Sequence, residues 1–137
     1  MASLLNAIIQ IQTAFVTNIP GLAQVPEMPP EDAGAFPFLV TFPQTGTHSW
    51  RAAGQRVDMH TIAIELHVGR KDLPLDIRKA LHYAELIPGA LKTAEIAGEV
   101  SDVMLFEEGN YLFGPMLWGG VETVGFHWNQ PIRLNIT

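Results

Sequence analysis

Five histidines are the residues of this sequence that first suggest metal binding or acid–base catalysis. His60 and His67 lie seven positions apart in one predicted strand, so their side chains point to opposite faces and cannot share an ion. His82 lies in a predicted helix, His127 in the last predicted strand and His48 in a loop. A small metal- or ligand-binding enzyme therefore requires the fold to bring His60, His82 and His127 together. We expect ordinary hydrogen-bonded histidines instead.

Other catalytic patterns are absent from the sequence. Ser49 and Ser101 lie in no Gly-x-Ser-x-Gly elbow, and no Gly-rich phosphate-binding loop is present. The adjacent carboxylates Glu107 and Glu108 point to opposite faces of a strand, which does not suit a glycosidase pair. The chain has no cysteine, which excludes a thiol nucleophile and a disulfide. We therefore predict neither an enzyme nor a cofactor site.

The charges are segregated along the chain. Seven of the eight basic residues lie between Arg51 and Lys92, and the segments before and after are predominantly acidic. One interpretation is a chance distribution over a solvated surface. The other is a contact between the basic middle of one copy and the acidic end of the next, with exposed tryptophans as anchors. The candidate interface residues are Trp50, Arg51, Arg56, Arg70, Lys71, Glu107 and Glu108.

Length and composition favour one compact domain over residues 1–137, with 47% hydrophobic and 16% charged residues. The formal net charge of −6 argues against a broad nucleic-acid-binding face, which requires clustered basic residues. The first sixteen residues have no basic residue and carry several polar ones, so we expect neither a signal peptide nor a membrane span.

The first third of the chain predicts a helix followed by a proline-rich segment. Ser3 is a candidate N-cap, and Leu4, Ile8, Ile11 and Phe15 follow at helical spacing. Residues 20–35 contain four prolines and form an extended arm or a long loop. This segment either binds a neighbouring subunit or crosses the surface of its own molecule.

The middle of the chain predicts two strands around a long hairpin connection. Residues 36–42 form a short apolar strand, and residues 43–57 are the polar hairpin connection, with Trp50 at its centre and arms that can form short strands. Residues 59–68 alternate between apolar and mostly polar positions, as in a central strand with one buried and one lightly covered face.

The remaining segments complete an α+β domain. Its mixed, mostly antiparallel sheet has the N-terminal helix and a central helix packed on one face, with long hairpin or arm extensions. Pro131 implies an edge position or a bulge in the last strand. The expected elements are a helix capped by Asp72, an interruption at Pro88–Gly89, a second helical stretch over 90–98, a strand over 101–108, a turn at Gly109–Asn110, a Gly-rich bend over 113–120 and a terminal strand over 121–137.

The run HTIAIELHVGRKDLPLDIRKALHYAELIPGAL (residues 60–91) resembles the middle of tail-terminator and related minor tail proteins of long-tailed bacteriophages. The ends match that family in layout: an N-terminal helix, an arm, a strand and helix, then paired strands. The proline-rich segment and the run FGPMLWGG (113–120) depart from the family's pattern.

The resemblance implies a homohexameric ring that caps the tail tube, halts its polymerisation and presents a surface to the head connector. Its partners would be the tail tube protein and a connector or neck protein, in the virion at the head-proximal end of the tail, after assembly in the host cytoplasm. DNA would pass through an acidic lumen without specific binding. A neck or tail-completion protein between connector and tail remains an alternative.

Overall fold

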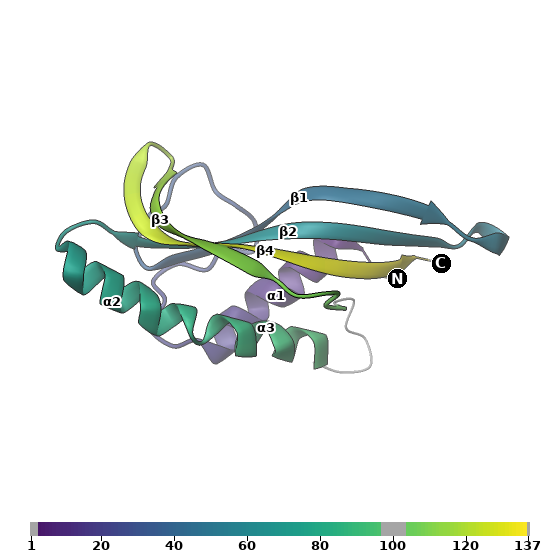
Figure 1. Cartoon of the computed structure of the whole chain (residues 1–137), viewed down its shortest axis with the longest axis horizontal. Coiled ribbons are helices and arrows are strands. Elements are labelled where there is room, and N and C mark those ends of the chain that lie inside the picture. The colour runs from purple at the N-terminus through teal and green to yellow at the C-terminus, as the bar shows by residue number, and fades with distance from the viewer. Residues whose placement is uncertain (1–2, 97–103, 137) are drawn as a thin grey trace.

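The computed structural model describes residues 3–96 and 104–136 and shows an α+β fold, which confirms the predicted fold class (Figure 1). One antiparallel sheet of four strands has the order β1-β2-β4-β3. The helices lie together below the sheet in the view of Figure 1. The elements are α1 (Leu4–Asn18), β1 (Phe38–Trp50), a 3₁₀ turn (Ala52–Gly54), β2 (Arg56–Gly69), α2 (Leu73–Ala84), α3 (Ile87–Ile96), β3 (Asn110–Trp118) and β4 (Val121–Ile136).

The helix α1 begins and packs as its sequence predicts. The Ser3 hydroxyl oxygen accepts a hydrogen bond from the backbone N–H of Asn6 at 3.0 Å, as an N-cap does. Ile11 and Phe15 are buried in the core against the sheet, and Ile8 is also buried. The helix contributes one wall of a single core, which also holds the even-numbered apolar residues of β2.

The strand β2 is central, as predicted, but both of its faces are covered along the C-terminal half. Ile64 and Leu66 face the helical core, and His67 on the opposite face is also fully buried. Aromatic rings of Phe38 and Trp118 pack around the His67 imidazole, with ring centroids 5.7 and 5.6 Å away. The prediction of a lightly covered second face is therefore wrong here.

The predicted hairpin connection over 43–57 is mostly strand. β1 passes through Pro43 with a register shift before Thr45 and pairs with β2 as far as Trp50 and Arg56. Only residues 51–55 form the turn, which the backbone N–H of Arg51 closes by donating to the Gln55 carbonyl at 2.7 Å. Residues 43–50 are all exposed, so this part of β1 does not need the apolar side chains that a strand packed on a core requires.

The strand predicted over 101–108 is also misplaced. Residues 101–103 lie outside the described residues, and Leu105 makes only an isolated bridge to Ile132. The third strand instead covers 110–118, where the sequence suggested a turn and a Gly-rich bend. Its register against β4 runs from Asn110–Asn129 to Trp118–Val121, and Gly119 and Gly120 form the turn in the left-handed region.

Pro131 lies where β4 has lost its β3 neighbour, because the β3 ladder ends at Asn129. On that side the Pro131 carbonyl accepts a hydrogen bond from the backbone N–H of Phe106 at 3.0 Å. The missing N–H of proline thus falls where β3 no longer pairs with β4, which corresponds to the edge position of the two alternatives that the sequence left.

The proline-rich segment folds back onto its own molecule. The Tyr83 hydroxyl donates to the Gly21 carbonyl, and the Trp118 indole N–H donates to the Pro30 carbonyl, both at 3.1 Å. Gln12 from α1 donates to the Pro26 carbonyl at 2.7 Å. The sequence left two alternatives for this segment, and these contacts agree with the one in which it crosses the surface of its own molecule.

The α2 helix starts at Asp72, but a different carboxylate stabilises its first turn. Asp72 makes no capping hydrogen bond, whereas Asp76 accepts from the backbone N–H groups of Lys71 and Asp72 at 2.8 and 2.9 Å. Asp76 is consequently buried rather than exposed. The predicted interruption falls at residues 85–86, and α3 then includes Pro88 in its first turn, where its missing N–H costs nothing.

Candidate functional site

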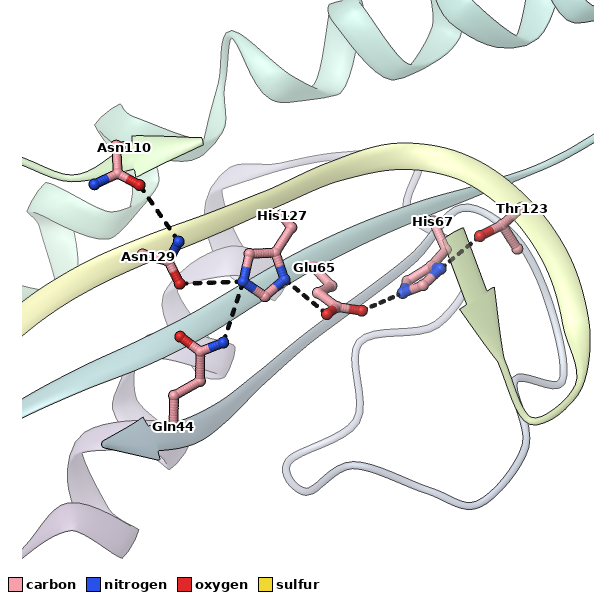
Figure 2. A network of polar contacts seen from close by, with 7 residues as sticks. All are labelled: Gln44, Glu65, His67, Asn110, Thr123, His127 and Asn129. Carbon is pink, nitrogen blue, oxygen red and sulfur yellow. Dashed lines mark hydrogen bonds and ion pairs between the residues drawn. The ribbon is translucent and has the colours of Figure 1, made fainter. Parts of the chain in front are cut away.

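A chain of polar side chains crosses the sheet on the face opposite the helices (Figure 2). Its centre is Glu65 on β2, whose Oε2 lies 2.8 Å from Nδ1 of His127 and whose Oε1 lies 2.8 Å from Nε2 of His67. The Thr123 hydroxyl is 2.7 Å from Nδ1 of His67. Gln44 and Asn129 reach Nε2 of His127 at 3.3 and 3.1 Å. Through a further contact from Asn129 to Asn110, the network joins all four strands.

The protonation pattern of this network follows from Glu65. An ionised carboxylate only accepts, so each facing imidazole nitrogen carries a proton and donates it. Burial raises the pKa of Glu65, and the hydrogen bonds and charges of His67 and His127 outweigh it, so the pKa is lower than usual. Nε2 of His127 has both a donor amide and an acceptor amide oxygen nearby, so either ring state finds a partner.

Thr123, His67 and Glu65 form a hydrogen-bonded series of hydroxyl, imidazole and carboxylate, the three groups of a catalytic triad. Both Thr123 and His67 have an exposed fraction of 0%. A nucleophile must reach its substrate, and no substrate atom can approach this hydroxyl. The arrangement is thus a buried polar network that fixes the strands, because each of its buried groups has a partner.

The three histidines of the enzyme alternative lie apart. His60 lies 3.7 Å from Asp58 near the hairpin, and its alternation along β2 places it on the face opposite to His67. His127 belongs to the Glu65 network, and His82 packs its ring against Tyr83 on α2. Among residues 3–96 and 104–136, no group of three or more potential ligand side chains is placed to hold a metal ion.

The hairpin tip carries an exposed tryptophan held above a charged cluster. Trp50 has an exposed fraction of 70%, and the Arg56 guanidinium carbon lies 5.6 Å from its ring centroid. Arg56 Nε and His48 Nδ1 each contact Asp58 Oδ1 at 2.8 Å. Burial raises the pKa of Asp58, but these hydrogen bonds and charges leave it below its usual value. Three of the candidate interface residues, Trp50, Arg51 and Arg56, therefore meet at one tip.

The other basic candidates lie at the opposite end of β2. Arg70 and Lys71 follow Gly69, where the strand ends, and both are exposed. Arg70 makes a long ion pair of 3.9 Å with exposed Glu122. About 45 Å of strand separates the two ends at 3.3 Å per residue. The structure therefore divides the four basic candidate residues between two surfaces.

The acidic candidates Glu107 and Glu108 are exposed between Phe106 and β3. Glu107 has a φ of 58°, a left-handed conformation that is uncommon outside glycine, so this segment turns sharply before β3 begins.

The edge strand β3 leaves large apolar side chains uncovered on both of its faces. The exposed fractions are 61% for Tyr111, 71% for Leu112, 43% for Phe113 and 64% for Leu117. Its outer edge has no further strand in the described part of the chain. Edge strands are usually protected by charges, prolines or covering elements, and this one has only Pro115.

An apolar groove of about 470 Å³ lies between the inner face of β3–β4 and the α2–α3 junction. We call it the aromatic groove, because Tyr111, Phe126 and Trp128 form its sheet wall. Their rings contact one another, with Phe126 and Trp128 stacked at 5.2 Å. Leu81, Ile87 and Leu91 form the helical wall.

Leu81 has the helical spacing of a buried position but is exposed. It lies four residues after Ile77 and three before Ala84 on α2, yet its exposed fraction at the groove is 48%. Trp128 is half-buried, with one side open to the groove.

Sequence reasoning missed the Glu65 network and the aromatic groove. The alternation of β2 places Glu65 and His67 on one face of the strand, and this is the signal that the sequence offers. Their partners His127 and Thr123 are 62 and 56 residues away, so the pairing depends on the β2–β4 register.

No protein-family model and no curated protein matches this chain. Among the described residues, no helix is both long and apolar enough to cross a membrane.

Proposed function

We propose that this chain is a structural virion protein: a tail terminator that forms a ring on the tail tube of a long-tailed phage and joins it to the head connector. The observation that carries the proposal is the uncovered edge strand β3, with Leu112 and Leu117 exposed along it. The resemblance of residues 60–91 to that family indicates which assembly would cover this strand, namely a ring on the tail tube.

An isolated subunit with this edge would be prone to aggregate. Contiguous apolar surface on a soluble protein marks an interaction site, and an unpaired strand edge is a template for pairing with another chain. Assembly with other subunits or with a tube would cover both features of β3. The projecting hairpin with exposed Trp50 is a second protruding surface, at a different place on the sheet (Figure 1).

The charge of the subunit agrees with passage of DNA through a ring. Each copy carries a formal charge of −6, which ring symmetry multiplies. A lumen lined by Asp and Glu repels phosphate, so DNA slides without adhering.

The test is to add the purified protein to polymerising tail tube protein and measure tube lengths by negative-stain electron microscopy. We expect tubes that stop growing and carry a ring at one end. Leu112→Arg, which places a charge on the exposed face of β3, should abolish capping. Leu75→Arg is the matched control, because Leu75 is also exposed, at 58%, but lies on α2.

Two outcomes would contradict the proposal. Tubes of unchanged length without bound protein would overturn a tail role. Binding to the head connector with no binding to the tube would favour the neck or tail-completion alternative.

A further inference from the structure

We propose that the hairpin tip of one copy inserts Trp50 into the aromatic groove of a second copy of this chain. The contact rests on the proposed function, because it would be the joint between neighbouring subunits of the ring. The hairpin tip at residues 50–56 and the α2–α3 junction lie at different places on the molecule (Figure 1). The groove is lined by residues of that junction.

The tip presents an anchor that is already oriented. Trp50 projects with an exposed fraction of 70%, and Arg56 lies over its ring in cation–π geometry. Asp58 holds Arg56 in place by the hydrogen bond to its Nε. An exposed tryptophan that is already positioned loses little conformational freedom on binding, which is typical of interface hot spots.

The groove has the lining that an indole ring requires. Its volume of about 470 Å³ falls in the range of sites that enclose an organic group. Aromatic rings pack favourably edge-to-face or offset against other rings, and Tyr111 and Trp128 offer such faces. Leu81 at the rim, with an exposed fraction of 48%, would be covered by the incoming tip.

Charge complementarity selects a second copy as the occupant. Beside Trp50 the tip carries Arg51, which is exposed and has no ion-pair partner within the described ranges. The groove is bordered by exposed Glu85, which lines it, and by Glu108, which precedes the lining residue Gly109. A basic, tryptophan-bearing tip and an acidic, aromatic groove on one chain are complementary in both charge and chemistry.

A subunit cannot fill its own groove. Ile64 lines the groove and lies eight residues along β2 from Arg56 at the tip. At 3.3 Å per residue this is about 26 Å of paired strand, which cannot fold back without breaking the sheet. Each copy therefore offers one tip and one groove, and such a heterologous contact closes into a ring or continues as a filament.

The test uses two variants that each remove one half of the contact. Trp50→Ala removes the anchor, and Leu81→Asp places a charge in the groove. Neither substitution touches a fully buried residue, so both proteins should fold with unchanged circular dichroism. By sedimentation velocity, each alone should self-associate at least about 30-fold more weakly than wild type.

A mixture of the two variants gives the sharpest result. One intact tip and one intact groove remain between them, so an equimolar mixture should form a heterodimer that grows no further. Leu75→Asp is the matched control for Leu81→Asp, since Leu75 is an exposed leucine on the same helix but does not line the groove. It should assemble like wild type.

Charge reversal tests the pairing of Arg51 at the tip of one copy with Glu85 at the groove of the next. Arg51→Glu should weaken association, and combining it with Glu85→Arg should restore it. Lys71→Glu is the control for the first change, because Lys71 is exposed at the far end of the sheet. Equal weakening by Lys71→Glu would overturn this placement of the contact.

The contact and the tail role fail in different ways. If Trp50→Ala forms rings or self-associates as strongly as wild type, the proposed contact is wrong, but the tail role is not contradicted. A wild-type chain that never self-associates, or a mixture that stays monomeric, would also overturn the contact. Only the tube-capping experiment decides the tail role.

Discussion

Glu65 and His127 face each other directly across the β2–β4 ladder, with 2.8 Å between Oε2 and Nδ1. The same carboxylate accepts from His67 through its other oxygen. One side chain with an exposed fraction of 14% thus satisfies two imidazoles in neighbouring positions of the central strands. This bridge makes the middle of the sheet sensitive to a single substitution.

Glu65→Gln should lower the free energy of unfolding at pH 7 by about 1–3 kcal/mol, the usual cost of leaving a buried polar group without a partner. The amide NH₂ faces one of the two imidazole N–H groups and cannot accept from it. Urea denaturation followed by circular dichroism measures the change. Glu122→Gln is the control, because Glu122 is 77% exposed and its contact to Arg70 is long. A loss of unfolding free energy above about 0.5 kcal/mol in Glu122→Gln would contradict the specific role of Glu65.

The stabilisation by Glu65 should depend on pH. Its pKa is lower in the folded protein, so its contribution is complete above the pKa of the unfolded chain. The contribution is lost as the pH falls through the folded pKa, because the unfolded chain binds the proton first. The stability difference between wild type and Glu65→Gln should therefore shrink below about pH 4. A difference that stays constant down to pH 2 would contradict the lowered pKa.

Gly125 and Gly114 are paired across β4 and β3, but only one of them requires glycine. A Cβ on Gly125 would collide with the backbone carbonyl oxygen of Leu66, whereas a Cβ on Gly114 meets nothing within 4 Å. Gly125→Ala should destabilise the protein by about 3 kcal/mol, and Gly114→Ala should be close to neutral. Thermal unfolding of the two variants compares them. Equal melting temperatures would show that the β2–β4 approach is looser than described.

Local patterns were sufficient to locate the helices and β2 along the chain. Alternation identified Ile64 and Leu66 as a buried face, and the Ser3 hydroxyl was identified as a cap by its position before an apolar stripe. The missing N–H of Pro131 indicated an edge position or a bulge. The sequence signal for each of these features lies within a few neighbouring residues.

The errors arose where distant contacts overrode local signals. Glycine and proline in 110–118 suggested a bend, but the ladder with β4 keeps this segment extended. Polar residues in 44–50 suggested a hairpin connection with short strands at most, yet the ladder with β2 extends as far as Trp50. The aromatic groove depends on how β3 and the α2–α3 junction meet, which no local pattern of Tyr111 or Leu81 specifies.

Gln12 connects α1 to both the proline-rich segment and β1. It has an exposed fraction of 1%, donates to the carbonyls of Pro26 and Leu39, and accepts from the Thr41 hydroxyl at 2.7 Å. Gln12→Leu leaves these buried groups unpaired and should cost about 2–4 kcal/mol. Amide hydrogen exchange should also accelerate at Leu39.

The control for Gln12 is Thr17→Ala, a polar-to-apolar change at an exposed position of the same helix. The Thr17 hydroxyl bonds only within the helix, to the Thr13 carbonyl. We expect its effect to stay within about 0.5 kcal/mol. Unchanged exchange at Leu39 in Gln12→Leu would mean that other contacts hold β1 against α1.

Asp58 fixes the hairpin tip, because one buried oxygen receives both His48 and Arg56. Asp58→Asn removes the charge that these donors meet and should lower the free energy of unfolding by about 1–3 kcal/mol at pH 7. The pKa of Asp58 is lowered in the fold, so this difference should vanish as the pH falls through that pKa. Asp72→Asn is the matched control, since Asp72 is exposed and its side chain caps nothing. If both variants unfold at the same urea concentration, Asp58 does not hold Arg56 beneath Trp50, and the tip must be oriented by the turn at residues 51–55 alone.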